Sequence, residues 1–285
     1  MQKVMSLDEY YVLVKAAKKE NSAKASNCFL FPNAIKRFID LGRFYYEKQD
    51  GGILFYSDEE VYYEAYYYHN PEVAVRIEKK DKPVVISNIH TGAPLNDRLR
   101  SMEQRLKEAG FLLADTMRQT QGDAQKNLSK IERLCKYARR ELERDGFTLS
   151  PLSEKWFPAV RALLDNTPEL PFYLSPYYTT EELKQLCEDG FIVGIISADG
   201  ELCAAQHFFL EGKTLFGWEA VKENYKNLYG MALVMSEHIL GIAVERGYNV
   251  SGWIDLANEP SIQYHLKKGN IFTDRYMDHW VLTNH

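Results

Sequence analysis

The residues between 221 and 232 could hold a phosphate group. A predicted strand ends at Val221, a polar loop follows, and a predicted helix begins at Gly230 with Ala232 in its first turn. The first amide groups of a helix have no partner within the helix, and the helix dipole adds a positive potential there. Because Gly230 and Ala232 carry no bulky side chain, a pyrophosphate could approach the backbone closely. Close packing of the helix start is the alternative explanation for these small residues.

Other catalytic patterns are missing or incomplete. Gly212-Lys213-Thr214 ends like a phosphate-binding P-loop, but His207 stands at the position of its first glycine, so a hairpin turn is expected. No G-x-G-x-x-G follows a predicted strand, no H-E-x-x-H occurs, and Ser251 lacks the flanking glycines of a serine hydrolase. The chain has four cysteines, none of them in a C-x-x-C pair: Cys28, Cys135, Cys187 and Cys203. We therefore expect reduced thiols and no metal site.

The composition describes a soluble globular chain. Its 285 residues are 45% hydrophobic and 26% charged, with a formal net charge of −5, and they suffice for two domains. No run approaches the roughly 18 apolar residues of a membrane helix, and Asp8 and Glu9 stand where a signal peptide would be basic or apolar. We therefore expect a cytoplasmic protein without membrane contact. The acidic balance makes nucleic acid an unlikely partner.

The second half of the chain predicts one compact arrangement of strands and helices. Apolar periodicity and turn residues mark the order β-β-β-α-β-α-β. The expected elements are strands at 191–197, 202–210 and 214–222, a helix at 230–246, a strand at 249–256, a helix at 258–268 and a strand at 272–282. The first three strands are joined by tight turns at Asp199-Gly200 and Glu211-Gly212, which predicts an antiparallel meander.

The first half of the chain contains a weaker echo of this order. It predicts helices at 7–19, 33–46 and 95–109, and strands at 53–56, 61–69, 84–89 and 111–116. The fold class is therefore α+β, with a mixed, mainly antiparallel sheet flanked by helices. We expect an N-terminal α+β domain at 1–122 that is a degenerate repeat, a connector helix within 123–146, and a second domain at 147–285.

The C-terminal half resembles the GNAT superfamily of acyl-coenzyme A-dependent N-acyltransferases. In this family the loop after the fourth strand has the pattern R/Q-x-x-G-x-G/A, which Gly230 and Ala232 match, with Asn227 at the arginine or glutamine position. A second family pattern, N-x-x-A-x-x-x-Y-x-x-x-G-F, can be laid on 258–270. Asn258 and Gly269 match it, whereas the alanine, tyrosine and phenylalanine positions hold Ser261, His265 and Asn270.

The resemblance implies where a coenzyme would bind. In the family the fourth and fifth strands, here 214–222 and 249–256, splay apart and hold the pantetheine arm between them. The donor would be acetyl-coenzyme A, and the acceptor a primary amine of a small molecule or peptide that attacks the thioester directly in a ternary complex. The residues expected to bind the coenzyme are Val221, Asn227, Leu228, Tyr229, Gly230, Met231, Ala232, Asn258 and Ser261.

The same resemblance suggests the catalytic residues. Glu219 lies on the fourth strand and is the candidate base; a solvated or salt-bridged glutamate is the alternative. His265 occupies the position of the family's tyrosine acid, so it is the candidate acid for the departing thiolate or else a coenzyme contact or packing residue. Tyr264, one residue earlier, is the reserve acid. His207 could face the acceptor, or belong to a hydrogen-bond network.

Two other functions fit the resemblance. A noncatalytic module that binds acyl-coenzyme A would explain the departures at Asn227 and His265. A transferase that takes aminoacyl groups from transfer RNA would share the tandem organisation, although the chain lacks a basic stripe. The connector helix could serve a homodimer.

Overall fold

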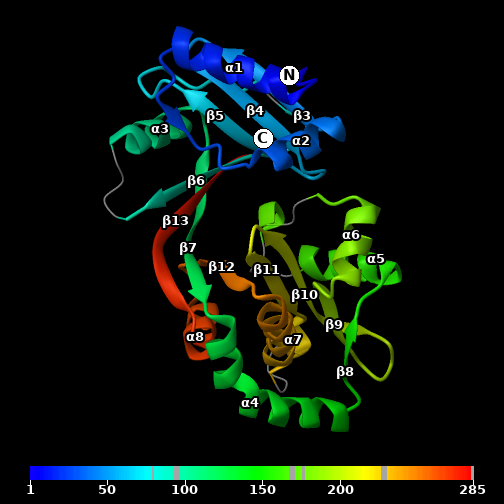
Figure 1. Ribbon diagram of the computed structural model, residues 1–285. Helices are drawn as coiled ribbons and strands as arrows, with labels where there is room; N and C mark the ends of the chain where they lie inside the picture. Colours follow the sequence, from blue (N-terminus) through cyan, green and yellow to red (C-terminus); the bar gives the residue numbers. More distant parts are fainter. Residues whose placement is uncertain (79, 93–96, 167–170, 175–176, 226–229, 284–285) are drawn as a thin grey trace. The chain divides into compact units, whose positions relative to one another are not determined.

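The computed structural model describes residues 1–285 apart from 79, 93–96, 167–170, 175–176, 226–229 and 284–285 (Figure 1). The chain divides into two compact units. Unit 1 comprises Met1–Met117 and Asp274–His285, and unit 2 comprises Arg118–Thr273. The predicted fold class is confirmed, because mainly antiparallel strands are flanked by helices in both units. Across the described ranges, no helix combines the length and the apolar character needed to span a membrane.

Unit 1 contains strands in the order β1-β3-β4-β5-β6-β13-β7. Strands β5 and β6 are parallel, whereas β3/β4, β4/β5 and β6/β13 are antiparallel. Its elements are β1 (Gln2–Lys3), α1 (Leu7–Glu20), β2 (Ala25–Ser26), α2 (Pro32–Asp40), β3 (Phe44–Gln49), β4 (Gly52–Asp58), β5 (Tyr63–His69), β6 (Val84–Thr91), α3 (Asp97–Glu108) and parts of β7 (Leu112–Gly122) and β13 (Ile271–Leu282).

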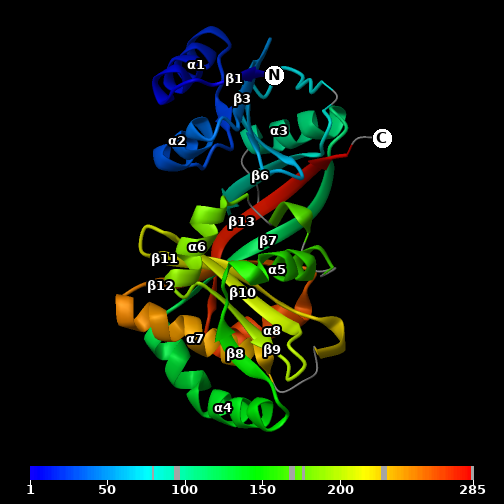
Figure 2. The same cartoon turned by 90° about the vertical axis from the view of Figure 1, so that its right-hand side faces the viewer.

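Alternating residues of β4 divide unit 1 into two hydrophobic cores. Ile53 and Phe55 pack with residues of α1 and α2, whereas Leu54 and Tyr56 pack on the opposite face with residues of α3. This follows from the two-residue period of a strand, which points successive side chains to opposite faces. Figure 2 shows α1 and α2 on one side of these strands and α3 on the other.

The prediction of a single helix at 33–46 is wrong. Helix α2 ends at Asp40, Gly42 adopts a left-handed conformation with φ of +69°, and β3 begins at Phe44. Phe44 is fully buried, and its ring stacks on Phe55 of the neighbouring strand with 5.7 Å between ring centroids. Cross-strand aromatic packing therefore outweighs the helical pattern in this segment.

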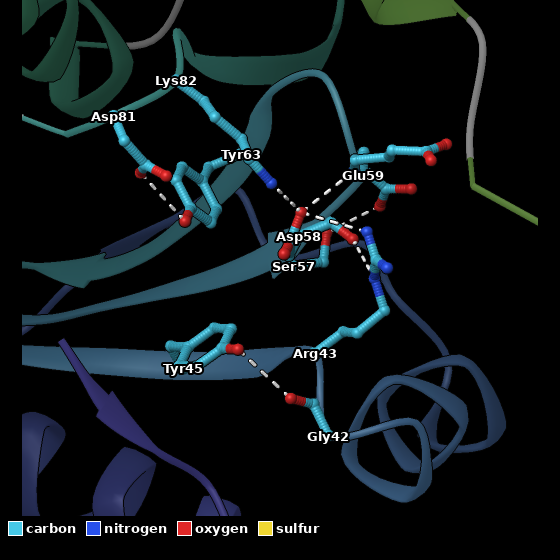
Figure 3. Close-up of polar contacts among 10 residues, drawn as sticks. Gly42, Arg43, Tyr45, Ser57, Asp58, Glu59, Tyr63, Asp81 and Lys82 are labelled. Atoms are coloured by element: carbon cyan, nitrogen blue, oxygen red, sulfur yellow. Dashed lines mark hydrogen bonds and ion pairs between the residues drawn. The ribbon is translucent and has the colours of Figure 1, made fainter.

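Polar side chains form hydrogen bonds around the turn between β4 and β5 (Figure 3). The Asp58 carboxylate accepts hydrogen bonds from Lys82 Nζ at 2.7 Å and from Arg43 Nη2 at 3.1 Å. Ser57 Oγ donates to Glu59 Oε1 at 2.7 Å, and both residues are buried. Lys82 and Arg43 lower the pKa of Asp58, although burial opposes this shift.

A side chain of unit 1 bridges the two parallel strands where they separate. Strands β5 and β6 pair only at Tyr63/Val84 and Glu64/Val85. Beyond this point, Asn27 Nδ2 donates to the backbone oxygens of Ala65 and Ser87, both at 3.1 Å, and Asn27 Oδ1 accepts from the Tyr67 amide at 2.6 Å. The short strand β2, just before Asn27, pairs with Tyr68 and His69 of β5. This opening is therefore closed by the chain itself.

Unit 2 contains the predicted meander and the elements that follow it. The strand order runs β7-β12-β11-β10-β9-β8. Besides the remainders of β7 and β13, its elements are α4 (Ala124–Arg144), β8 (Thr148–Pro151), α5 (Phe157–Asp165), α6 (Thr180–Glu188), β9 (Ile192–Ile196), β10 (Leu202–Glu211), β11 (Thr214–Val221), α7 (Met231–Arg246), β12 (Asn249–Asp255) and α8 (Glu259–Lys268), with three 3-10 helices at Glu154–Trp156, Phe172–Leu174 and Glu223–Tyr225.

Helices cover both faces of the unit 2 strands (Figure 1). Leu215 and Val221 pack with residues of α4 and α7 on one face, whereas Trp218 and Ala220 pack with residues of α5 and α6 on the other. Glu219 alternates with Ala220 and therefore belongs to the face covered by α7. Its hydrogen bond with Ser236 of α7 agrees with this position.

The compact units cut the chain at other points than the predicted domain boundaries. Residues from both ends of the chain meet in unit 1, where Arg275–Leu282 of β13 pair with Val84–Thr91 of β6. In unit 2 the end of β7 bonds to β12: Ser251 Oγ donates to the Thr120 backbone oxygen at 2.7 Å. The division at 122 and 146 stays a prediction about an ancestral repeat.

Candidate functional site

Unit 2 has an open strand edge at the predicted coenzyme position. Strand β11 pairs with β10 along its whole length, but it pairs with β12 only at Thr214/Asn249 and Leu215/Val250. From Phe216 onward, no strand of the described chain pairs with this edge of β11. Backbone amides and carbonyls normally need partners. The edge can therefore accept an extended ligand that carries amide groups of its own.

The helix start after this edge has the geometry predicted for an anion site. Gly230 is the N-cap of α7 in a left-handed conformation, with φ of +64° and ψ of +47°, and no side chain caps the helix. A Cβ at this position would lie 3.3 Å from Leu233 Cβ, so glycine serves both the conformation and the packing. The Met231 side chain is buried in the core, which leaves only its backbone for a ligand. Asn227, Leu228 and Tyr229 lie outside the described residues.

A cavity of about 600 Å³ lies beside the end of β11. Val221, one of the predicted coenzyme residues, lies in its wall. Glu201 in the same wall accepts hydrogen bonds from Lys222 Nζ at 2.7 Å and from Tyr225 OH at 3.0 Å, and these partners lower the pKa of Glu201. The cavity has both an apolar wall of helix α5 and a charged rim, a combination common in ligand sites.

Glu219 lies on the open part of β11 and is held by neutral partners. Its Oε2 accepts hydrogen bonds from Gln206 Nε2 at 3.0 Å and from Ser236 Oγ at 3.3 Å. Gln206 and Ser236 are almost fully buried, with 1% and 2% exposure. Both bonds end on Oε2 and hold the carboxylate in place, and the Tyr264 hydroxyl also interacts with Glu219.

Tyr264 belongs to the same network. Its hydroxyl lies 2.9 Å from Ser236 Oγ, and Lys268 Nζ donates to Ser236 Oγ at 3.0 Å. The Lys268 ammonium also lies 4.1 Å from the centre of the Tyr264 ring, which is a cation–π contact. Burial, followed by the charge of Glu219, raises the pKa of Tyr264 well above its ordinary value. Tyr264 is therefore a protonated phenol at neutral pH.

His265 points to a different set of partners. Its Nδ1 lies 2.9 Å from Asn270 Nδ2, so the imidazole shares a hydrogen bond with this amide. Burial and then the charge of Lys268 lower the pKa of His265 well below its ordinary value. His265 is a neutral imidazole, and no hydrogen bond found among the described residues joins it to Glu219. The structure thus brings Glu219 together with the reserve acid.

The two remaining predicted coenzyme residues form a helix cap. Asn258 is the N-cap of α8, and its Oδ1 accepts from the Ser261 amide at 3.1 Å. This bond satisfies one of the amides that a helix start leaves without a partner. The Ser261 amide is therefore occupied by the protein itself.

The opposite face of the meander carries an aromatic group around His207. The His207 ring lies 5.4 Å from that of Trp218 and 5.2 Å from that of Tyr178. Burial lowers the pKa of His207 to about 4, so the imidazole is neutral at pH 7. Its Nε2 has no hydrogen-bond partner within the described ranges, in contrast to the network considered from the sequence.

Three residues of the Glu219 network were missed from the sequence: Gln206, Ser236 and Lys268. Lys268 stands four residues after Tyr264, a spacing that places both on one face of a helix. Ser236 is a hydroxyl residue within the apolar stripe of α7, next to Met235. These two signals could have been noticed, whereas the Gln206 contact depends on the register of β10 and β11. No cluster of metal ligands occurs among the described side chains.

Comparisons with known proteins agree on the fold. No model of a protein family and no curated protein matches the sequence. A GCN5-related N-acetyltransferase-like protein from Streptococcus suis is a structural match with a TM-score of 0.56 and 11% identity, covering 96% of this chain and 100% of the other.

Two further solved structures give the same result. A GCN5-related N-acetyltransferase from Sphaerobacter thermophilus has a TM-score of 0.51 and 12% identity, covering 95% and 90% of the two chains. A GCN5-related glucosamine N-acetyltransferase region of a fungal multi-domain GH3 β-N-acetylglucosaminidase has a TM-score of 0.60 and 11% identity, covering 98% of this chain and 37% of that one. The chain therefore has the fold of GCN5-related N-acetyltransferases, and the predicted resemblance is confirmed at the level of fold.

Proposed function

We propose that the protein is an N-acyltransferase that moves the acetyl group of acetyl-coenzyme A directly to a primary amine in a ternary complex. One observation carries the proposal: the open edge of β11, which bears Glu219, is followed along the sequence by the helix start at Gly230, which no side chain of the described residues caps. A strand edge, a carboxylate and a candidate anion site thus follow one another within the fifteen residues from Phe216 to Gly230, as the reaction requires.

The donor would be held mainly by backbone groups. The two amides of a pantetheine arm would pair with the edge of β11 near Val221, and the pyrophosphate would bind the amides at Gly230, Met231 and Ala232. Asn227, Leu228 and Tyr229 remain predicted contacts of the coenzyme. Asn258 and Ser261 would act by fixing the start of α8, since the Asn258 side chain caps the helix at the Ser261 amide.

The acceptor amine must lose a proton before or during attack. An amine with a pKa near 10 is mostly an ammonium ion at neutral pH, and only the neutral form is a nucleophile. The first proton leaves for solvent, and Glu219 takes the second as the nitrogen attacks the thioester carbon. The C–N bond forms, the C–S bond breaks, and the electron pair of that bond leaves with the thiolate.

Tyr264 is the proposed acid for that thiolate. Its phenol is protonated over the whole physiological range, and Ser236 ties it to the strand that carries Glu219. His265 is neutral and holds Asn270, so we assign it a role in packing α8 against the segment that follows.

Calorimetry and turnover test this function. Titration with acetyl-coenzyme A should show binding, and incubation with a panel of small amines and peptides should release free thiol with at least one of them. The absence of binding at millimolar acetyl-coenzyme A would overturn the proposal. Binding without turnover for any amine would instead indicate a noncatalytic coenzyme module.

A further inference from the structure

The proposed base and the proposed acid are connected through one hydroxyl group. Ser236 Oγ lies 3.3 Å from Glu219 Oε2 and 2.9 Å from the Tyr264 hydroxyl. Ser236 is 2% exposed, so bulk water has little access to it. These three side chains come from β11, α7 and α8, which are distant in sequence and meet only in the folded unit.

The hydrogen positions in this group follow from simple counting. A hydroxyl has one hydrogen to donate and two lone pairs to accept with. Lys268 has only donors, so its 3.0 Å contact uses one lone pair of Ser236 Oγ. The carboxylate of Glu219 only accepts, so it takes the Ser236 hydrogen. The second lone pair is left for the Tyr264 hydroxyl, and all three contacts of Ser236 are satisfied with one orientation.

We propose that Ser236, oriented by Lys268, relays the proton gained by Glu219 to Tyr264 as Tyr264 protonates the departing thiolate. This inference rests on the proposed function and adds two positioning residues to it. This proton wire consists of two hydrogen bonds, one between Glu219 and Ser236 and one between Ser236 and Tyr264. During the relay each hydrogen moves to the next atom along the wire.

The relay balances every proton. After attack, Glu219 holds the proton of the amine and the thiolate carries a negative charge. The hydroxyls first rotate, so that the Ser236 hydrogen faces the Tyr264 oxygen and the Tyr264 hydrogen faces the sulfur. Tyr264 then gives its hydroxyl hydrogen to the sulfur, Ser236 gives its hydrogen to the Tyr264 oxygen, and Glu219 gives its proton to the Ser236 oxygen, which restores the resting orientation of both hydroxyls. Free thiol is released, and all three side chains return to their starting forms without exchange with solvent.

The relay also removes an energetic difficulty. A phenol whose pKa lies well above 10 is a weaker acid than a thiol, so transfer from Tyr264 alone would be uphill. A carboxylic acid is a far stronger acid than a thiol, and coupling through Ser236 makes it the real source of the proton.

Lys268 supports the relay electrostatically. Its ammonium lies beside both Ser236 and the Tyr264 ring, so it stabilises negative charge on either end of the wire. The other titratable groups that act on this site are Cys135 of α4 and His265 of α8. Burial raises the pKa of Cys135 to about 12 and lowers that of His265, so both are neutral at pH 7. Burial also lowers the pKa of Lys268, and the nearby Glu219 and Cys135 oppose this shift.

Single-turnover and steady-state kinetics of Ser236→Ala test the relay. The change removes one oxygen and introduces a strong helix former, so α7 should persist. Wild type and variant are compared with acetyl-coenzyme A and the fastest amine of the panel. With enzyme in excess, the rate of amide formation should stay within about threefold, because the acyl group moves before the relay acts. The steady-state kcat should fall about tenfold or more, because proton return then depends on solvent.

Two further measurements complete the test. Ser236→Thr restores a hydroxyl and should recover part of the lost turnover, and the exposed Ser129→Ala serves as the matched control on α4. Affinity for acetyl-coenzyme A, measured by calorimetry, should not change in Ser236→Ala. Equal steady-state rates in Ser236→Ala and wild type would overturn the relay, and so would equal slowing of single-turnover and steady-state rates. Neither result would affect the proposed function, which fails if the wild type shows no coenzyme binding or no turnover with any amine.

Discussion

In each unit a pair of parallel strands separates and leaves an opening between the strands. The two openings differ in what fills them. In unit 1 the opening between β5 and β6 is filled by Asn27, which hydrogen-bonds to both strands, and by the short strand β2. In unit 2 the opening between β11 and β12 receives no strand in the part of the chain that is described. Residues 70–83 join β5 to β6 without a helix among those described, whereas α7 joins β11 to β12.

The comparison separates what the fold requires from what a coenzyme requires. A splayed pair of strands leaves backbone groups that must be satisfied, and unit 1 satisfies them with its own amide side chain. A pyrophosphate additionally needs a helix start. Among the described residues, the connection from β11 to β12 provides one, whereas the connection from β5 to β6 does not. We therefore expect one coenzyme per chain, bound by unit 2.

The largest effect is expected from Gly230→Glu. A side chain at this left-handed position meets Leu233, and its carboxylate would stand where the phosphates bind. Affinity for acetyl-coenzyme A should fall by more than about a hundredfold, or over 2.7 kcal/mol, measured by calorimetry. Gly212→Glu is the matched control, because Gly212 is also exposed and left-handed, with φ of +61°, but lies in the β10–β11 turn. Equal affinity in both variants would place the coenzyme elsewhere.

Asn27→Ala should have the next largest effect, on stability rather than binding. It leaves the backbone groups of Ala65, Tyr67 and Ser87 buried without their partner, and each such group costs about 1–3 kcal/mol. We expect unit 1 to lose about 3 kcal/mol in urea unfolding, while one coenzyme per chain still binds. As a control, Asn21→Ala removes a solvent-exposed hydrogen bond to the Asp50 oxygen and should cost less than 1 kcal/mol.

The outcome of that experiment bears directly on the comparison. A stoichiometry of two in calorimetry, in either the wild type or Asn27→Ala, would mean that the opening in unit 1 is a second coenzyme site. An unchanged unfolding free energy would mean that Asn27 does not close it.

Much of unit 2 could be predicted from the sequence because its signals are local. The elements from β9 to β13 lie within about two residues of their predicted bounds, since glycine turns such as Gly200 and Gly212 mark the ends of periodic apolar segments. The helix starting after Gly230 was predicted for the same reason. The fold of unit 2 and the helix start at Gly230 could therefore be predicted from short-range patterns.

The rest depends on contacts between distant residues. The incorrect prediction of a helix at 33–46 missed β3, which pairs with β4 and gives unit 1 a three-stranded antiparallel meander with β5. Asn27 looked like an ordinary loop residue, because its partners stand 38 to 60 residues away. The choice between Tyr264 and His265 likewise required knowing which one reaches Ser236.

Phenylalanine substitutions at these two neighbouring positions sharpen the assignment in unit 2. Tyr264→Phe removes only the hydroxyl in contact with Ser236 and should lower kcat about a hundredfold, with acetyl-coenzyme A affinity unchanged. His265→Phe should lower kcat less than about threefold, although the loss of its bond with Asn270 should reduce stability by about 1 kcal/mol. The reverse order of the two kcat values would return the acid role to His265.

A pH-dependent effect contrasts the glutamates at the two openings, where Glu219 is partly exposed and Glu64 of β5 is buried. Burial raises the pKa of Glu64 to about 8, although Ser87 Oγ donates to it at 2.7 Å. Between pH 4.3 and pH 8 the native state then binds a proton that the unfolded state releases, so the unfolding free energy falls by up to about 1.4 kcal/mol per pH unit as pH rises. In Glu64→Gln this contribution disappears, so urea unfolding at pH 5.5 and pH 7.5 should show a smaller loss of stability than in wild type. The exposed Glu143→Gln should keep the wild-type slope, and a slope in Glu64→Gln that matches it would show that Glu64 is ionised inside the closed opening.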